Sequence, residues 1–336
     1  MYNVAVTKNS NQIVSKNLNT TLNVANAFLI DHGIVVTIES DANAAVCALY
    51  NIKEGCRQVY HLDSLDDFKG NSSDIMNAET ARIVFSKASG HGFIVLFTNQ
   101  KTNIQHFSYV EYQCTLEFSS PRTLDFAASS VCMDENVLIF NQSEAKNNLA
   151  IFMQEFGELS ENKFDFKVEQ LESIERIRNL AENWFLLETT IIENGSPIKQ
   201  VSMFNPQLQE LYPLEYTFND TYIRNQFETC EFYGVHHETK CVNMVSVAFE
   251  GFSFKKSELK VMADNDELVC DGTFASFEGG FINGNNVHIA ESTDKNEGIQ
   301  NVSTTNIDSF SFLSVSKNEF IALNNEGTAV WGKIDF

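Results

Sequence analysis

The hydrophobic residues of this chain gather in short runs that recur along its whole length. Each run holds about four to eight β-forming residues, too few for a buried helix, and ends in a stretch rich in Asn, Gly or Glu. A second, alternating stretch such as Ile104–Val110 follows, as in successive β-hairpins. The runs are Gly33–Ser40, Gly92–Asn99, Asn136–Asn141, Asn183–Thr189, Val242–Phe249 and Phe320–Gly327.

The spacing of these runs predicts a radial repeat. The intervals between them are roughly 45 to 60 residues, in the range of sheet-based repeats. Candidate blades centre near residues 5, 35, 95, 138, 186, 245 and 322. A propeller usually has about four to eight blades, and each blade adds its own core. We therefore expect an all-β fold, a β-propeller of seven four-stranded blades.

Both ends of the chain have the pattern of strands, which predicts closure of the propeller. Asn3–Val6 can pair beside the last strands, Thr328–Ile334, so that no sheet edge is left open. The chain has four prolines and no linker rich in Pro, Gly or Ser between two halves. We therefore expect residues 1–336 to form a single domain.

Two segments depart from this pattern. The first is Gln170–Ala181, where every third position is apolar: Leu171, Ile174, Ile177 and Leu180. This spacing predicts one or two helical turns that grip a partner or plug a blade edge, although propeller strands can carry the same residues. The second, Glu278–Asn306, is polar and rich in turn residues. We expect a long loop there, and such loops are often functional.

The charge of the chain favours a basic protein partner. It has 45 acidic and 23 basic residues, for a formal net charge of −22. Such a surface repels phosphate backbones, and no local basic patch offsets it, so we expect no direct contact with nucleic acid. Long-range attraction would steer a basic protein toward it. Solubility alone explains the same charge equally well.

The cysteines indicate a reducing compartment. The seven are scattered with no close CxxC pair, as expected of thiols used as small hydrophobic residues in the cytosol or nucleus. The N-terminus lacks the pattern of a signal peptide. No apolar run approaches the roughly 18 residues that a transmembrane helix needs, so we expect no membrane association.

Patterns for catalysis and cofactor binding are weak. The chain has no P-loop, dinucleotide-binding turn or GxSxG motif. His236–Glu238 and Cys241 are metal-ligand types, but zinc sites need two separated pairs, and adjacent histidines on a strand point to opposite faces. Asp264–Asp266 resembles the start of a calcium loop, yet Leu268 occupies a ligand position. We expect no metal, no cofactor, no catalytic residue and no enzymatic activity.

Acidic residues on turn-like segments late in the chain are the candidate partner-binding site. Carboxylates on loops of a rigid scaffold can pair bidentately with arginines of another protein. For any single residue, an ordinary solvated loop explains the pattern as well. The candidates are Asp264, Asp266, Glu267, Asp271, Glu291, Asp294 and Glu297.

Two turns in the last third of the chain carry a family resemblance. Asp294–Glu297 combines Asp-Lys with a further acid, and Asn324–Gly327 joins an apolar strand to the last strand. Together they resemble the end of the amino-terminal β-propeller of the cytoplasmic-face FG nucleoporin that binds the DEAD-box mRNA-export helicase. The family's Pro-x-Gly step is missing, because Gly298–Gln300 stands in its place.

The resemblance implies a non-enzymatic scaffold module on the cytoplasmic face of the nuclear pore complex, with a role in mRNA export and protein transport. Its acidic loops would grip basic residues on the RecA-like domain of the helicase, compete there with RNA and help release the helicase. Other nucleoporins would be further partners. By position, the family's contact loop corresponds to Asp294 and Glu297, followed by Glu291 and the group from Asp264 to Asp271.

Two other functions stay open. One is a propeller adaptor in another multiprotein assembly, such as ubiquitin ligase, coat or ciliary machinery. The other is a propeller hydrolase with carboxylates in the central channel. Charge reversal at Asp294 and Glu297 separates helicase docking from the adaptor role, because only docking predicts lost binding. A deep axial pocket with converging carboxylates would indicate the hydrolase.

Overall fold

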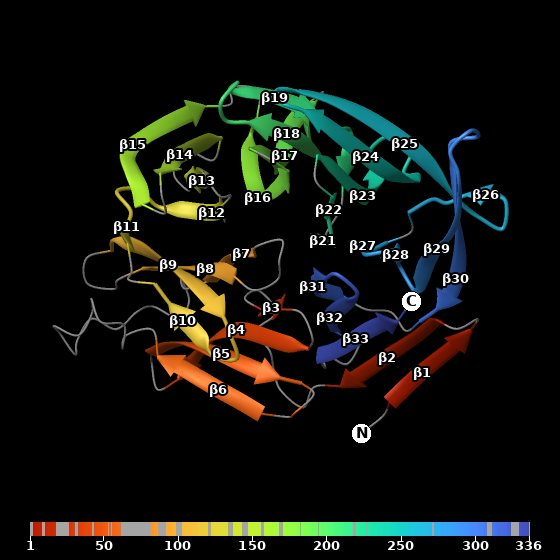
Figure 1. Ribbon diagram of the computed structural model, residues 1–336, viewed down its shortest axis with the longest axis horizontal. Helices are drawn as coiled ribbons and strands as arrows, with labels where there is room; N and C mark the ends of the chain where they lie inside the picture. The colour runs from red at the N-terminus through yellow and green to blue at the C-terminus, as the bar shows by residue number, and fades with distance from the viewer. Residues whose placement is uncertain are drawn as a thin grey trace. The chain divides into compact units, whose positions relative to one another are not determined.

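In a computed structural model, the described part of the chain consists of strands and connecting turns (Figure 1). Residues 3–335 are described except for gaps at 9–10, 18–26, 31–32, 42–43, 53, 55, 62–81, 87–91, 99–102, 120–121, 134–136, 143–146, 156–157, 168–170, 182, 194, 218–219, 227, 271, 308–310 and 324–328. Within the described residues, no helix is both long and apolar enough to cross a membrane.

The chain divides into two compact units. Unit 1 comprises residues 1–25, 29–33 and 215–336, and unit 2 comprises residues 26–28 and 34–214. The expectation of a single propeller domain over residues 1–336 stays a prediction.

Residues 27–213 form antiparallel sheets in which consecutive strands pair. The first sheet has the order β3 (Ala27–Ile30), β4 (Ile34–Asp41), β5 (Ala44–Asn51), β6 (Cys56–His61). The second has the order β10 (Leu116–Phe118), β9 (Gln105–Tyr112), β8 (Gly92–Thr98), β7 (Arg82–Ser86), with β11 (Arg122–Thr123) also on β9. The third has the order β12 (Ala128–Met133), β13 (Val137–Gln142), β14 (Asn148–Glu155), β15 (Glu158–Lys167). The fourth has the order β16 (Ser173–Ala181), β17 (Trp184–Glu193), β18 (Ser196–Asn205), β19 (Glu210–Pro213).

One sheet of unit 1 joins the two ends of the chain. Its order is β1 (Asn3–Lys8), β2 (Asn11–Asn17), β33 (Ala329–Asp335), β32 (Glu319–Leu323), β31 (Ser311–Ser316). The predicted pairing of N-terminal with C-terminal strands is confirmed, but the strand beside β33 is β2. In this antiparallel pair Gln12 lies opposite Asp335 and Asn17 lies opposite Val330. The first strand, β1, pairs with β2 and forms the edge.

The other sheet of unit 1 has eleven strands. Its main path is β20 (Tyr216–Thr217), β23 (Thr229–His236), β24 (Val242–Glu250), β25 (Ser253–Ala263), β30 (Ile299–Asn306), β29 (Asn286–Asp294), β28 (Gly280–Asn283), β27 (Phe274–Phe277), β21 (Asp220–Thr221). Beside this path, β22 (Arg224–Gln226) pairs with β23, and β26 (Asp266–Glu267) pairs with β25.

The repeated antiparallel meander makes the protein an all-β propeller, but the number of blades differs from the prediction. Five of the sheets formed by the described residues have four or five strands each, so there are five separate blades and not seven. The centres expected near residues 5 and 322 lie in one sheet. The run at 242–249 shares its sheet with β27 to β30, because parallel pairing of Lys260–Met262 with Ile299–Asn301 merges two groups of strands.

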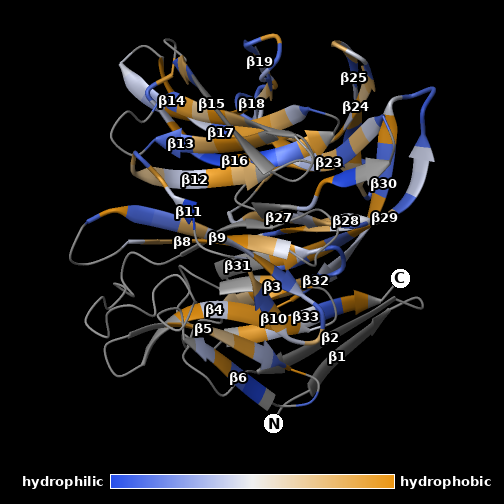
Figure 2. Ribbon diagram, turned by 60° about the vertical axis from the view of Figure 1, so that its left-hand side comes forward, coloured by the Kyte–Doolittle hydropathy of each residue, from blue (hydrophilic) through white to orange (hydrophobic). Residues whose placement is uncertain are grey.

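Strand burial follows the hydrophobic pattern of the sequence. All but the last residue of β8 are buried, as expected for a central strand covered on both faces. Its neighbour β9 mixes buried and half-buried positions and has one exposed residue, Glu111. In Figure 2 hydrophobic residues lie along such strands, whereas the tip of the β29–β30 hairpin is hydrophilic.

The cores lie between neighbouring sheets. In unit 2 a large cluster draws on strands β8, β9, β12 to β14 and β16 to β18. In unit 1 one cluster joins β23 to β25 with β27, β28 and β30 and includes Tyr233 and Phe281. A second joins β27 to β29 with β32 and β33 and includes Phe277 and Phe320. Both halves of the eleven-stranded sheet are therefore held by packing as well as by hydrogen bonds.

The helical turns predicted for Gln170–Ala181 are wrong, since Ser173–Ala181 is strand β16. The apolar residues at every third position are nevertheless all buried. The pairing of β16 with β17 shifts register between Ile174 and Arg176 and again between Asn179 and Ala181. Each β-bulge inserts one residue, so side chains three positions apart reach the same face.

The long loop predicted for Glu278–Asn306 is also wrong, because it contains strands β28, β29 and β30. The Asn and Gly residues that suggested a loop form tight hairpin turns. The segment Asn283–Asn286 connects β28 to β29, and its Gly284 has a φ of 56°, in the left-handed region that favours glycine.

Candidate partner-binding surface

The topology of unit 1 brings two acidic segments of the sequence onto neighbouring strands. The strand order is β26, β25, β30, β29. Across it, Glu267 lies opposite Met262, Met262 opposite Asn301, and Asn301 opposite Ser292. Two residues before Met262 on β25, Lys260 lies opposite Ile299, and Ile299 lies opposite Asp294. We refer to residues 264–267 and 291–297 as the acidic turns.

The first acidic turn connects β25 to β26. Asp264 and Asn265 have φ values of 51° and 71°, as in the two-residue hairpin turns that place both central residues in the left-handed region. Asp and Asn tolerate this conformation better than other non-glycine residues. Asp264, Asp266 and Glu267 are all exposed. The turn therefore presents three carboxylates to solvent on a short, hydrogen-bonded hairpin.

The second acidic turn connects β29 to β30 and is held by one of its own carboxylates. Oδ1 of Asp294 accepts hydrogen bonds from the backbone N–H groups of Asn296 at 2.9 Å and Glu297 at 3.1 Å. This arrangement is an Asx turn, which satisfies backbone donors that no strand would reach. Gly298 closes the turn with a φ of 70°. Asp294 thus shapes the segment that presents Glu297.

A buried glutamine orders the hairpin that carries the second turn. Oε1 of Gln300 accepts a hydrogen bond from Thr293 Oγ1 at 2.6 Å, and its Nε2 donates to the carbonyl of Ser292 at 3.1 Å. Gln300 is only 3% exposed, so these bonds are shielded from water. A pre-ordered hairpin loses less conformational entropy when a partner binds to its tip.

Carboxylates outnumber lysines at the two acidic turns. Residues 260–267 carry three acids and one lysine, and residues 291–298 carry the same numbers, so the net charge of the two segments is −4. Lys260 forms an ion pair with Glu267, with Nζ and Oε2 3.2 Å apart. Since both side chains are exposed, that pair contributes little to stability and leaves the surface predominantly negative.

The structure places six of the seven predicted site residues. Asp264, Asp266, Glu267, Glu291, Asp294 and Glu297 are exposed on β25 to β26 and β29 to β30. The seventh, Asp271, lies outside the described residues, as does the turn Asn324–Gly327. Sequence reasoning missed Lys260 and Gln300, although Lys260 stands close to three acids in the sequence. Only the β25–β30 pairing makes them part of one surface.

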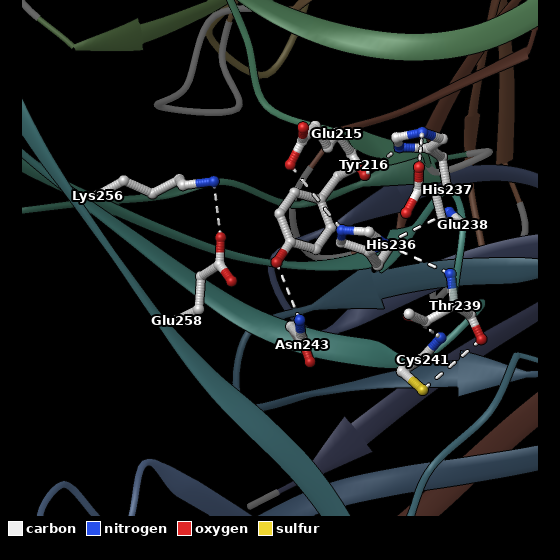
Figure 3. A network of polar contacts seen from close by, with 10 residues as sticks. All are labelled: Glu215, Tyr216, His236, His237, Glu238, Thr239, Cys241, Asn243, Lys256 and Glu258. Atoms are coloured by element: carbon white, nitrogen blue, oxygen red, sulfur yellow. Dashed lines mark hydrogen bonds and ion pairs between the residues drawn. The ribbon is translucent and has the colours of Figure 1, made fainter.

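The turn His236–Cys241 holds a second group of polar residues (Figure 3). The expected orientation of the two histidines toward opposite faces is wrong. Their rings are stacked, with centroids 5.3 Å apart and planes 14° apart. The reason is that β23 ends at His236, so His237 belongs to the turn and does not follow the alternation of a strand.

Both histidines form hydrogen bonds with backbone groups, His236 within this turn and His237 with Glu215. Nδ1 of His236 lies 3.3 Å from the backbone N–H of Glu238 and 3.4 Å from that of Thr239, so it accepts. Nδ1 of His237 lies 3.0 Å from the carbonyl of Glu215, so it donates. Within the described part of the chain, no three His, Cys, Asp or Glu side chains are placed to hold a metal ion. These histidines organise the turn.

Tyr216 connects this turn to the adjacent strands. Its side chain is fully buried, and its hydroxyl accepts a hydrogen bond from Asn243 Nδ2 at 2.9 Å. The Lys256 ammonium lies 5.8 Å from the ring centroid and pairs with Glu258 at 2.7 Å (Figure 3). Burial raises the pKa of Tyr216 well above its usual range. The phenol stays protonated at neutral pH and serves packing.

Comparisons with known proteins identify no family: no protein-family model matches the chain, and no curated protein matches its sequence. Similar solved structures include the β-propeller domain of the Trilobed protease from Pyrococcus furiosus, which has an open velcro topology, with 11% identity, a TM-score of 0.49, and coverage of 92% of this chain and 94% of that one. BamB from Moraxella catarrhalis has 11% identity and a TM-score of 0.39, covering 99% and 100%.

A third similar structure contains S. cerevisiae Dbp5 bound to Nup159, Gle1, IP6 and ADP, with 10% identity, a TM-score of 0.40, and coverage of 96% of this chain and 94% of the matching one. Identities and TM-scores this low say nothing about activity, partner or location. The nucleoporin identity and the nuclear pore and mRNA-export roles expected from the sequence have no support in these comparisons. The β-propeller fold is what remains of that expectation.

Proposed function

We propose that this protein is a non-enzymatic binding platform whose acidic turns dock a basic segment of a protein partner. The observation that supports the proposal is the parallel pairing of β25 with β30, which sets Asp266 and Glu267 on one side of a four-strand patch and Asp294 on the other. The patch is negative and exposed, and it is built from hairpins with internal hydrogen bonds.

The geometry favours arginine over lysine in the partner. Carboxylates spread over several adjacent strands can each accept two parallel N–H groups from a planar guanidinium. Strands in a sheet are about 4.8 Å apart and rise about 3.3 Å per residue, so Glu267 on β26 and Asp294 on β29 lie roughly 14 Å apart across the sheet and roughly 7 Å apart along it. The tips of the two acidic turns project from opposite ends of the parallel pair β25 and β30. A partner segment with basic residues separated by a similar distance would engage both turns at once.

Binding of a labelled arginine-rich peptide, followed by fluorescence anisotropy, tests this function. Substituting Asp294→Asn and Glu297→Gln together with Asp266→Asn and Glu267→Gln should weaken binding about tenfold or more, or ~1.4 kcal/mol. Asn at position 294 keeps an acceptor for the turn, so lost affinity would reflect lost charge and not a disordered hairpin. Affinity should also fall as ionic strength rises.

A matched control removes the same number of charges elsewhere. Glu111 and Glu117 are exposed and face each other on β9 and β10. Glu111→Gln and Glu117→Gln, compared with the Asp294→Asn and Glu297→Gln pair, should leave peptide affinity nearly unchanged. Equal losses in the two pairs would mean that net charge alone attracts the peptide, which contradicts a defined docking surface.

The DEAD-box mRNA-export helicase is the specific partner that the sequence resemblance suggests. Its purified RecA-like domain, titrated in place of the peptide, should bind the unmodified protein and lose affinity with the same four substitutions. A peptide that binds at the acidic turns while the helicase domain does not would keep the docking function and reject the helicase. In that outcome the protein is better described as an adaptor in another assembly.

A further inference from the structure

Strand β25 has an open edge along its first half. On one side it pairs with β24 from Ser253 to Lys260. On the other side it pairs with β30 only at Lys260, Val261 and Met262. Among the described residues, no strand pairs with this second side between Lys255 and Leu259. An unpaired strand edge is a ready template for another extended chain.

The register shows which backbone groups point outward from this edge. The N–H of Lys260 donates to the carbonyl of Gly298, on the side away from β24, at 2.8 Å. In an antiparallel ladder every second residue directs both N–H and C=O to the same side. Lys256 and Glu258 therefore direct their backbone groups away from β24, and those groups have no hydrogen-bond partner among the described residues.

The side chains of this segment are accessible on both faces. From Ser253 to Lys260, six residues are exposed and the other two half-buried. Most strands bury at least one face, so this segment is more accessible than is usual for a strand. Phe252, at the tip of the β24–β25 hairpin, is 59% exposed and adds an apolar contact next to the edge.

The charge of the segment is opposite to that of the whole protein. Residues 253–260 carry three lysines and one glutamate, a net charge of +2, whereas the chain has −22. The charged side chain of Lys255 is exposed and forms no ion pair with a described residue. The acidic turns begin only at the far end, beyond Lys260. An incoming strand with acidic side chains would be favoured beside Lys255 and Lys256.

We propose that the edge of β25 from Ser253 to Glu258 binds an extended acidic segment of another protein by strand addition. Backbone hydrogen bonds to Lys256 and Glu258 supply affinity, and acidic side chains next to Lys255 and Lys256 supply selectivity. A second copy of this chain is a poor occupant, because it would bring lysines opposite lysines and join two strongly negative molecules. This site is separate from the acidic turns and needs a partner of opposite charge.

A short fluorescein-labelled peptide of alternating Val and Glu tests the proposal by fluorescence anisotropy. Two versions carry N-methyl groups on alternate amides, in one register or the other. The version whose methyl groups face β25 should bind about tenfold more weakly or worse, while the other keeps its affinity, because strand addition uses only one set of amides. Equal affinity of both versions would overturn strand addition.

Variants of the protein test the same edge. Glu258→Pro removes an outward N–H that β24 does not use, so it should abolish peptide binding while circular dichroism keeps the spectrum of the folded protein. Lys255→Glu should weaken binding, whereas the control Arg122→Glu on β11, an equal charge change in unit 2, should not. If a Val-Lys peptide binds as well as the Val-Glu peptide and loses as much affinity with Glu258→Pro, the acidic character of the partner is wrong.

The two binding proposals fail independently. Loss of arginine-rich peptide binding through the acidic-turn variants leaves the β25 edge intact, and the Glu258→Pro variant leaves Asp294 and Glu297 intact. Amide hydrogen exchange gives a second readout that needs no variant. The amides of Lys256 and Glu258 should exchange fast in the free protein and become protected with the Val-Glu peptide, and unchanged exchange at both positions would contradict the proposal.

Discussion

His288 is a buried histidine with one nitrogen left without a hydrogen bond. It is 3% exposed and lies on β29 in the core between the two halves of the eleven-stranded sheet. Its ring stacks on Phe281 with centroids 4.9 Å apart, and its Nδ1 lies 3.0 Å from Thr304 Oγ1. No described residue bonds to Nε2. Burial lowers the pKa of His288 to about 4.

This depressed pKa predicts a loss of stability in mild acid. The unfolded chain takes up a proton near pH 6.5 and the folded protein only near pH 4, so stability is full above pH 6.5 and falls as the pH drops toward 4. The loss attributable to His288 is at most about 3 kcal/mol. Urea unfolding at a series of pH values measures it.

The control for His288 is His288→Leu, which removes the titrating group. Other groups titrate in the same range, so the informative quantity is the difference in unfolding free energy between the two proteins. Relative to the variant, the unmodified protein should lose stability between pH 6.5 and 4. A difference that stays constant with pH would show that His288 does not resist protonation in the folded protein.

At the scale of an element, Asp294 stabilises the β29–β30 hairpin in addition to contributing a negative charge. Asp294 accepts two backbone hydrogen bonds in its turn. Asp294→Ala should therefore lower the unfolding free energy by about 1 kcal/mol, while Asp294→Asn, which keeps a side-chain oxygen, should cost less. Thermal or urea unfolding of the two variants measures the difference. Equal stability of the two would mean that the Asx turn contributes nothing.

The apolar pattern of a strand predicts its structure correctly in β8 but not in β16. The continuous apolar run of β8 predicts a central strand, and it is one. The apolar residues of β16 stand three apart because of two bulges, a spacing that is otherwise typical of a helix. A bulge depends on how the partner strand β17 is paired, so the sequence of β16 alone does not predict it.

At the scale of the whole molecule, the pairing of β2 with β33 determines whether β33 is an inner strand or the edge of the C-terminal sheet. Removing residues 1–17 deletes six residue pairs of this ladder and should lower the unfolding free energy by roughly 3 kcal/mol or more. The exposed edge of β33 should also promote association. Unfolding curves and light scattering measure both effects.

Removal of residues 1–9 alone is the control for this truncation. It deletes β1 but leaves β2 paired with β33. This shorter deletion should cost much less stability and should not raise the molar mass in solution. If both deletions lower the unfolding free energy equally, the stability comes from β1 and not from the β2–β33 ladder.

The sequence by itself determined where most strands lie, because the alternation of buried and exposed side chains is a local property of each run. It also identified the acidic residues at 264–267 and 291–297, since carboxylates on turns are visible without a structure. Only the tertiary structure decided how many blades there are and that the strands carrying the two acidic turns are neighbours. The blade number depends on the pairing of β2 with β33 and of β25 with β30, and the position of the acidic turns depends on the second pairing, across about 40 intervening residues. These pairings are made through backbone groups, which carry no side-chain pattern that would reveal their partner.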